Sequence, residues 1–588
     1  MGVTVKSVAM AACSTVLLGA CVSSSTPSAV APMAGKRVES DRGMVAASHP
    51  DAAAAGAAIL AQGGNAVDAF VATAFALSVT DVSQTGLGGG GAMTFYDAKT
   101  RRVEHLSFYP RTGNDPLWAQ ADSSRGRSMG RAAATPGMVA GLLEAHAKWG
   151  SLTRAVVMAP AIRLARDGFI VSPLLSRTIA SSRAKMQADS VAMARFMPRG
   201  EALRPGERLV QPELANTLER VRDGGRDAFY TGAIAERLSA KVKSLGGLIN
   251  VSDLRQYPVT ALRPLCTTWR EFTVLGAPPP MGGSSVLEML QMAEQSGVAT
   301  AGGFTSEPDA VVKMADILRL ANADAGRWRG DPLTMRVPAR GVATPGFAQQ
   351  RAGLVGGALP DTVQAGDALA FDTTAIPDAC RRFDPYPALV AAVASPEPET
   401  PAAGDEPAEG HSLTSHLSVV DARGNAVSAT TTVGVLFGSG VYTDGFWLNS
   451  SGSNFDARTR GINRYANSTM SPTLILQGND VRLVIGAAGS QYIQPAITQV
   501  TVRTLAFGED PWTAIAAPRI YASASQKDVE VEPGFTSAVY AALVTRGYRP
   551  VSRVADITMG GVHAVYVRKD GRRIGVADPR RDGVAAGQ

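Results

Sequence analysis

The first half of the chain places its apolar residues mainly at helical spacing. Two alanine-rich stretches, residues 49–62 and 65–79, are separated by a Gly-Gly pair and predict two helices joined by a turn. Helical patterns interrupted by Gly, Asp and Asn turns continue to about residue 255. This half of the chain is therefore predicted to be mostly helical.

Extended segments interrupt the helical half and dominate the remainder. Short apolar and β-branched runs predict strands at 92–98, 103–108 and 272–275. Residues 417–419 and 427–429 flank an Arg-Gly-Asn turn, a pattern typical of a β-hairpin. One further helix is expected at 495–506. The whole pattern predicts a mixed chain of helices and strands, helix-rich first and strand-rich last.

The composition is that of a globular protein. Of 588 residues, 45% are hydrophobic and 18% are charged, which excludes a disordered tail, a coiled coil and a fibre. The formal charge of +6 is spread along the chain and not concentrated on one face, so no nucleic-acid partner is expected. Four cysteines are too few for a disulfide scaffold or a multi-cysteine zinc module. Length alone predicts roughly three or four domains.

The N-terminus has the features of an export signal. Lys6 is followed by a short apolar run and then by Leu-Gly-Ala before Cys21, and the run is too short to span a membrane. It resembles a bacterial lipoprotein signal, so we expect removal of residues 1–20, a lipid on Cys21, and a tether over 21–42. The protein would then be periplasmic, anchored to the outer membrane in preference to the inner one. An ordinary secretory signal is the alternative.

Two motifs occur in contexts that argue against their usual chemistry. The run GLGGGG at 86–91 matches a dinucleotide-binding pattern, but a predicted helix precedes it and a strand follows, which reverses the required order. The G-x-S-x-G string at 126–130 follows a polar segment instead of the buried strand of a nucleophile elbow. With neither H-E-x-x-H nor C-x-x-C present, we expect no metal and no cofactor. In an oxidising compartment Cys266 and Cys380 are able to pair, a question that the sequence leaves open.

A threonine that opens a strand just after an exposed segment suggests a specific chemistry. Residues 395–413 hold four prolines and five acidic residues and have almost nothing to bury, so they predict a flexible acidic linker. If the bond between Leu413 and Thr414 is cut, the new α-amino group, with a pKa near ~8, becomes a base for the threonine's own hydroxyl. From the local pattern alone, a surface hairpin that happens to begin with threonine is the favoured explanation.

Longer strings decide between these readings. The segment TSHLSVVDARGNAVSATTT, followed by FGSG, resembles the start of the small subunit in the γ-glutamyltransferase family of N-terminal-nucleophile hydrolases. SHPDAAAAGAAILAQGGNAVDAFVAT, ATPGMVAGLLEAH, PAIRLARDGFIVS and the terminal ADPRRDGVAAG resemble further family blocks in family order. The resemblance implies an α+β fold, a four-layer αββα sandwich, autoprocessed into a large subunit (43–413) and a small catalytic subunit (414–588). One such fold replaces the several domains that length suggested.

The resemblance also implies roles for individual residues. Thr414 is expected to cleave the chain and then to act as the nucleophile, with Thr432 hydrogen-bonding to it. Gly489 and Ser490 match the pair whose backbone N–H groups bind the oxyanion, and a serine there still has its N–H to donate. The substrate's α-carboxylate is matched to a pair of hydroxyl residues, Ser468 and Thr469.

The positions that would recognise a glutamyl head group depart from the family pattern. A carboxylate calls for a guanidinium and an ammonium calls for a carboxylate or amide oxygen. Tyr109 stands where the family has its arginine, and Arg111, two residues on, is the candidate replacement. The family's asparagine is Gly434, and its glutamine and aspartate align with Ser451 and Asn454. The ammonium thus loses its formal negative partner, a costly loss in a dry pocket.

The predicted function is hydrolysis or transfer of the γ-glutamyl group of glutathione-like amides through an acyl-threonine intermediate. One alternative is an acylase of the same mechanism that takes another acyl group, and a second is a non-catalytic binding lipoprotein. The expected partners are a small-molecule amide and the chain's own two processed subunits. Contact with a membrane is expected only through the lipid anchor.

Overall fold

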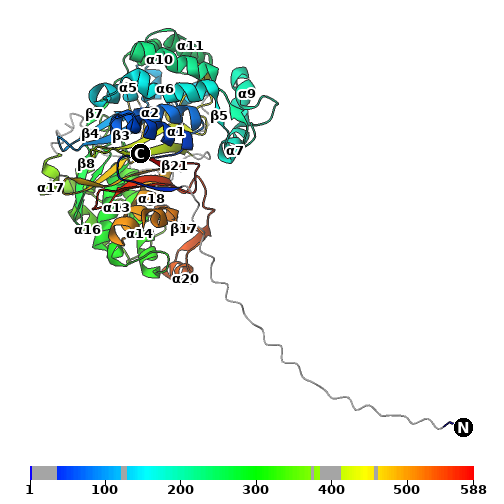
Figure 1. Cartoon of the computed structure of the whole chain (residues 1–588). Coiled ribbons are helices and arrows are strands. Elements are labelled where there is room, and N and C mark those ends of the chain that lie inside the picture. The colour runs from blue at the N-terminus through cyan, green and yellow to red at the C-terminus, as the bar shows by residue number, and fades with distance from the viewer. Residues whose placement is uncertain (3–35, 121–128, 373–376, 384–411, 456–460) are drawn as a thin grey trace. The chain divides into compact units, whose positions relative to one another are not determined.

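Two seven-stranded antiparallel sheets lie face to face at the centre of the molecule, and helices cover their outer faces (Figure 1). The computed structural model describes residues 1–2, 36–120, 129–372, 377–383, 412–455 and 461–588. From Lys36 onward the described chain belongs to one compact unit. The expected signal peptide, lipidation at Cys21, nearly all of the tether and linker, and Ser128 of the G-x-S-x-G string lie outside the described residues.

The first sheet contains the hairpin that begins at the candidate nucleophile. Its strand order is β21 (Val584–Gly587), β2 (Met44–Ala47), β10 (Ser412–Val420), β11 (Ala426–Val435), β3 (Gly90–Asp97), β4 (Arg102–Phe108) and β7 (Thr260–Leu262). The second sheet has the order β1 (Arg37–Ser40), β20 (Arg573–Ala577), β19 (Gly561–Val567), β15 (Asp480–Ala488), β14 (Thr473–Gln477), β9 (Phe272–Gly276) and β8 (Leu265–Trp269). Each sheet contains strands from both sides of Thr414, so a cut there leaves the two pieces paired.

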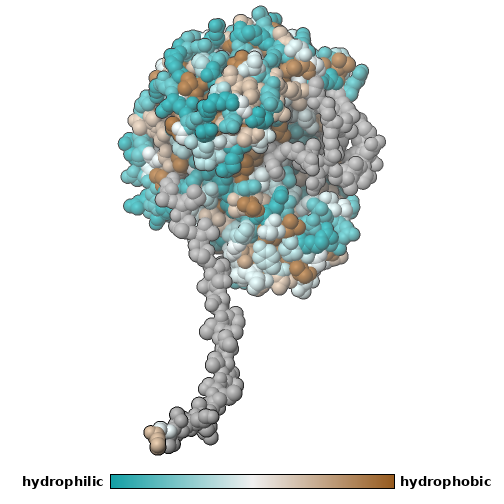
Figure 2. Space-filling view, turned by 90° about the vertical axis from the view of Figure 1, so that its right-hand side faces the viewer, coloured by the Kyte–Doolittle hydropathy of each residue, from teal (hydrophilic) through white to brown (hydrophobic). Residues whose placement is uncertain are grey.

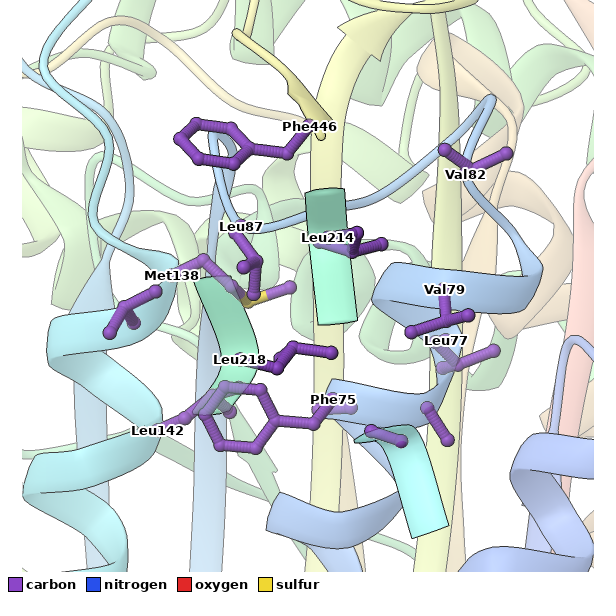
Figure 3. Packing of buried hydrophobic residues seen from close by; sticks show 14 of the residues in the cluster. Phe75, Leu77, Val79, Val82, Leu87, Met138, Leu142, Leu214, Leu218 and Phe446 are labelled. Carbon is purple, nitrogen blue, oxygen red and sulfur yellow. The ribbon is translucent and has the colours of Figure 1, made fainter. Parts of the chain in front are cut away.

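Successive side chains along each strand point to opposite faces of the sheet, and the two faces contact different layers. In β10, Leu417 and Val419 pack into the helical layer, whereas the ring of His416 faces Gly486 of the opposite sheet. The helices over the first sheet are α1 (Pro50–Ala61), α2 (Ala66–Thr80), α5 (Met138–Trp149), α6 (Arg154–Asp167), α10 (Pro212–Tyr230) and α11 (Ala233–Ser244). Between α2, α5 and α10, Phe75, Leu142 and Leu218 point toward one another (Figure 3).

The outer face of the second sheet packs on a separate hydrophobic core. Its helices are α13 (Gly283–Gln295), α14 (Pro308–Trp328), α16 (Pro345–Ala352), α18 (Ile493–Thr501) and α20 (Ser537–Arg546). The four layers confirm the predicted αββα sandwich. The helix expected at 495–506 is α18 followed by a π-helical turn, and the strands and hairpin expected around 92–108, 272–275 and 417–429 are present.

A disulfide joins Cys266 of β8 to Cys380 of α17 (Asp378–Arg381), which answers the question that the sequence left open. The surface seen in Figure 2 is mostly hydrophilic, with hydrophobic residues scattered over it. Among the described residues no helix is long and apolar enough to cross a membrane.

Candidate active site

Thr414 lies near the start of β10, opposite an irregularity in β11. Leu413 is paired with Gly434, but Ser415 is paired with Thr431, so β11 contains one residue more than β10 across this gap. Such a bulge re-aims a side chain that would otherwise follow the regular alternation. Only 3% of Thr414 is exposed. The strand pairing therefore holds the nucleophile and the preceding peptide bond in a buried, defined place.

The hydroxyl of Thr432 connects the nucleophile to the bond expected to break. Thr414 Oγ donates to Thr432 Oγ over 3.4 Å, and Thr432 Oγ donates to the carbonyl oxygen of Leu413 over 2.9 Å. The backbone N–H of Gly434 donates to the same Thr432 oxygen over 2.8 Å. These contacts use the one donor and both acceptor positions of the Thr432 hydroxyl. They direct the Thr414 proton toward Thr432 and polarise the Leu413 carbonyl.

Gly489 and Ser490 follow β15 and lead into the short helix η4 (Ser490–Tyr492), which contacts β10. Gly489 has φ of 134°, and a Cβ there would lie 2.8 Å from the carbonyl oxygen of Thr558, so the position requires glycine. Ser490 adopts φ of 54°, an uncommon conformation for a residue with a side chain. Within the described part of the chain neither N–H has a hydrogen-bond acceptor. Both remain available to an oxyanion.

A buried polar network that sequence reasoning missed supports Thr414 from behind. Arg581 donates from Nη1 to the Thr414 carbonyl oxygen over 2.9 Å and also hydrogen-bonds to Gln84 Oε1. Gln84 Nε2 donates to Asp81 over 2.7 Å, and the Ser415 hydroxyl donates to the same carboxylate. Burial raises the pKa of Asp81 to about 7 although the Ser415 hydroxyl and Arg581 oppose the shift. The available signal was a charged residue directly after a largely apolar, alanine-rich helix.

The GLGGGG loop brings backbone segments close together. A Cβ on Gly89 would lie 2.2 Å from the carbonyl oxygen of Thr432, and one on Gly88 would lie 2.3 Å from that of Trp447. Helix α2 precedes the loop and β3 follows it, so the dinucleotide-binding reading is excluded by the element order. The glycines let the loop support Thr432 from behind.

The phenol of Tyr109 is the meeting point of the residues expected to bind the substrate head group. Burial raises the pKa of Tyr109, and the neighbouring polar side chains of Ser451, Asn454 and Ser468 act in the opposite direction. Asn454 Nδ2 lies 3.5 Å from the phenolic oxygen. Thr432 pairs with β3, and β3 pairs with the end of β4 next to Tyr109, so the Tyr109 backbone lies about 10 Å from the Thr432 backbone across the sheet. The structure thus brings three of the predicted substrate-binding residues around a neutral hydroxyl group.

Arg111 is held in another direction. Its guanidinium donates to the carbonyl oxygen of Asn463 and lies 5.0 Å from the centre of the Tyr465 ring. Its backbone pairs with Thr135 and Tyr465. Among the described residues no contact joins it to Ser451, Asn454 or Ser468. The expected replacement for the family arginine is therefore engaged elsewhere in this structure.

Three predicted positions remain: Gly434, Ser468 and Thr469. Their surroundings leave no room for the family's asparagine at Gly434 and hold the two hydroxyl residues in place. Gly434 has φ of 91°, and a Cβ there would lie 2.1 Å from Ser450 Oγ, so this backbone has no room for the family's asparagine. Ser468 Oγ accepts from the N–H of Met470 over 3.2 Å, and the carbonyl oxygen of Thr469 accepts from Gln494 over 2.9 Å. Thr469 is thus tied through α18 to the loop that carries Gly489.

An αββα sandwich with a threonine held at the start of an internal strand defines the class of N-terminal-nucleophile hydrolases. Within this class the chain belongs to the gamma-glutamyltranspeptidase family, whose sequence profile matches residues 52–588. A glutathione hydrolase proenzyme of Bacillus subtilis (strain 168) is 31% identical over 565 residues, which cover 93% of this chain and 91% of the relative.

Relatives named for a different activity are equally similar. An acylase ACY 1 proenzyme of Pseudomonas sp. (strain SE83) is 31% identical over 570 residues, which cover 93% of this chain and 94% of the relative. The crystal structure of a cephalosporin acylase from Bacillus halodurans superposes with a TM-score of 0.80 at 25% identity, covering 96% of this chain and 99% of the other. The family is enzymatic, and its members carry the names of both glutathione hydrolases and acylases.

Proposed function

We propose that the protein cleaves itself between Leu413 and Thr414 and then hydrolyses amides through an acyl-Thr414 intermediate. In the first step Thr414 Oγ attacks the Leu413 carbonyl carbon, the C–N bond breaks, and the threonine nitrogen gains the proton that the hydroxyl loses. Water then hydrolyses the resulting ester to a Leu413 carboxylate and a free Thr414 amino group. The observation that carries this proposal is the Thr432 hydroxyl, which contacts both the attacking oxygen and the carbonyl oxygen.

Turnover uses the same groups on an external amide. The free amino group of Thr414 accepts the hydroxyl proton as Oγ attacks the substrate carbonyl, and the leaving amine takes that proton away. The N–H groups of Gly489 and Ser490 stabilise the oxyanion, each contributing about 3–4 kcal/mol in sites of this kind. Water completes the cycle by hydrolysing the acyl-threonine ester, unless an amine acceptor takes the acyl group instead.

For the acyl group we propose one that lacks the paired ammonium and carboxylate of a glutamyl head. The Tyr109 phenol meets Ser451, Asn454 and Ser468, all neutral, and its apolar neighbours are Ala277, Met281, Phe455 and Met470. A buried ammonium without a negative partner is costly, whereas a neutral acyl chain ending in a carbonyl or hydroxyl suits such a lining. The relatives named as acylases make this reading consistent with the family.

A γ-glutamyl group, as in glutathione, is the second candidate. Ser468 and Thr469 stand where the family holds the α-carboxylate, and Ser468 is already part of the Tyr109 cluster. The relatives named as glutathione hydrolases support this candidate.

The self-cleavage proposal is tested by denaturing gel electrophoresis of purified protein. Wild type should yield two fragments, the smaller corresponding to residues 414–588, with threonine as its N-terminal residue by mass spectrometry. Thr414→Ala should remain one chain, because alanine has no hydroxyl with which to attack. A wild-type chain that stays intact, or cleavage in Thr414→Ala, contradicts the proposal.

Substrate choice is tested with matched anilides on the processed enzyme. We expect aliphatic or aromatic acyl p-nitroanilides to be hydrolysed with a higher kcat/KM than γ-glutamyl p-nitroanilide. The reverse ranking would select the second candidate. No hydrolysis of any member of the series by cleaved protein would instead favour the non-catalytic alternative.

We further propose export and lipidation at Cys21, on the lipoprotein-like signal. In a bacterial host, Cys21→Ser should abolish incorporation of labelled fatty acid and release the protein from the membrane fraction. If Cys21→Ser still incorporates labelled fatty acid, Cys21 is not the lipid site and the proposal of lipidation at Cys21 is wrong.

A further inference from the structure

Arg581 joins the nucleophile to the loop that supports the oxyanion site. Its Nη1 donates to the carbonyl oxygen of Thr414 over 2.9 Å, and its Nη2 donates to the carbonyl oxygen of Ile557 over 2.7 Å. Ile557 precedes Thr558, whose own carbonyl oxygen lies against Gly489. Arg581 is only 3% exposed. One rigid guanidinium thus fixes the distance between the two parts of the reaction centre.

The restraints on Thr414 change when the chain is cut. In the intact chain, pairing of Leu413 with Gly434 and the bond from Thr432 to the Leu413 carbonyl hold the N-terminal side of Thr414. Cleavage gives Leu413 a free carboxylate end and removes its covalent hold on the nucleophile. The contacts that stay with the nucleophile are those of its hydroxyl with Thr432, of its carbonyl with Arg581 and of the Ser415 hydroxyl with Asp81.

We propose that Arg581 is a positioning residue for the N-terminal threonine, holding its backbone in the reactive orientation after self-cleavage and keeping its amino group in the basic form. This inference rests on the proposed function. Arg581 reaches the reaction only through the carbonyl group of Thr414, so it is not itself a catalytic residue.

The electrostatic part follows from distance. The guanidinium binds the carbonyl of the residue whose amino group becomes the base, which places the two cations about 5 Å apart. A like charge at that distance disfavours the protonated amine. The carboxylates that surround Arg581 belong to Asp81, Asp556, Asp578 and Asp582.

Local partners limit the opposing effect of these carboxylates. Asp578 is paired with Arg519 at 2.7 Å and with Arg580 at 3.1 Å. Asp556 accepts from the Thr558 hydroxyl over 2.6 Å, and Asp582 accepts from the Ser172 hydroxyl. The Asp81 carboxylate already accepts two hydrogen bonds within the network, from Ser415 and Gln84. Arg581 is therefore the cation nearest to the new amino group in this network.

The test compares Arg581→Gln and Arg581→Lys with wild type, using the best anilide substrate over a range of pH. Arg581→Gln keeps a donor and loses the charge, so kcat should fall about 10- to 100-fold with KM within about twofold, and the acidic limb of the kcat/KM profile should move to higher pH. Arg581→Lys keeps the charge, so the limb should stay at the wild-type position while kcat falls.

The matched control is Arg573→Gln. Arg573 is also a buried arginine that donates to backbone carbonyls, those of Asp41 and Asp421, at the opposite end of the sheets. Its replacement should lower thermal stability without moving the acidic limb.

Four outcomes of this experiment are decisive. If Arg581→Gln has wild-type kcat and the acidic limb of its kcat/KM profile does not move, the inference is wrong. The proposed function still holds in that case, provided that the wild-type protein cleaves itself and hydrolyses the anilide. An equal movement of the limb in Arg573→Gln would also overturn the inference. If Arg581→Gln does not fold, Arg581→Lys decides: reduced kcat at unchanged KM supports positioning, and wild-type kcat rejects it. Failure of wild type to cleave or hydrolyse would reject the proposed function itself.

Discussion

The two halves of the reaction centre differ in what builds them. The nucleophile region depends on backbone geometry: the bulge in β11, the positive φ of Gly489 and the hydrogen bond from Thr432 to the Leu413 carbonyl. The acyl-binding region depends on side chains that meet at Tyr109. The sequence predicts that the first keeps the family pattern, whereas the second is predicted to depart from it at the charged positions. Chemistry that needs an exact backbone is hard to change, and recognition that needs only side chains is easy to change.

The largest effect is expected from a substitution in the nucleophile region. Thr432→Val keeps the volume but removes the hydroxyl that contacts Thr414 and the Leu413 carbonyl. Self-cleavage should slow by about 10²–10³-fold, the usual cost of losing one oxyanion donor. Densitometry of the intact chain over time measures this. Thr431→Val, which removes a buried hydroxyl bonded to Thr85, is the matched control and should cleave within about tenfold of wild type. Equal rates in Thr432→Val and wild type would contradict the proposed role.

Removing the disulfide, which lies in neither the nucleophile region nor the acyl-binding region, tests whether the difference between these regions concerns chemistry instead of stability. Replacing both Cys266 and Cys380 by serine removes the disulfide between β8 and α17. In the uncleaved Thr414→Ala background, the free energy of unfolding in urea should fall by about 2–4 kcal/mol. With Thr414 present, self-cleavage and anilide hydrolysis at 25 °C should stay within about twofold of wild type. A selective loss of hydrolysis at unchanged stability would mean that the disulfide acts on the site.

Tyr109→Phe tests the acyl-binding region separately from the nucleophile region. It removes the hydroxyl that Asn454 approaches at 3.5 Å and leaves the ring in place. Self-cleavage should be unchanged, while kcat/KM for the preferred acyl anilide falls about tenfold, the value of a hydrogen bond of about 1.4 kcal/mol. If Tyr109→Phe slows self-cleavage and hydrolysis alike, the two regions are not separable as we argue.

The smallest effect on either region is expected from Glu288, a buried carboxyl group in α13. Burial and the neighbouring Asp324 raise the pKa of Glu288 well above its ordinary value, and Asp324 is paired with Arg351 at 2.8 Å. A pKa raised by folding stabilises the fold at low pH, and this contribution is lost as pH rises from about 4.5, at up to about 1.4 kcal/mol per pH unit. Urea unfolding of Thr414→Ala at several pH values should show this slope.

Adding Glu288→Gln to the Thr414→Ala protein should flatten the slope of unfolding free energy against pH, because the amide has no proton to lose. Hydrolysis by the Glu288→Gln enzyme with Thr414 intact should match wild type at pH 7. An unchanged slope of stability against pH would show that Glu288 is not the group responsible.

The sequence predicted local features well and remote ones poorly. The helices on either side of Gly63 and Gly64 and the hairpin that starts at Thr414 follow from periodicity and turn residues, and the structure confirms them. The role of Arg581 had no such signal, since it lies 167 positions from Thr414 and is adjacent only because β19 and β20 return to the active-site end. Arg111 shows the converse: two residues from Tyr109 in sequence, its side chain is held by Asn463.

By itself the sequence determined the fold class and predicted a cleavage position and a nucleophile, because strand periodicity, a composition break and long family-like strings are local properties of the chain. Only the tertiary structure decided which side chains share a site. It paired Cys266 with Cys380, surrounded the Tyr109 phenol with neutral groups, and placed Asp81, Gln84 and Arg581 behind Thr414. The physical reason is that burial and hydrogen-bond geometry set the energy of each polar group, and both depend on neighbours that are distant in sequence.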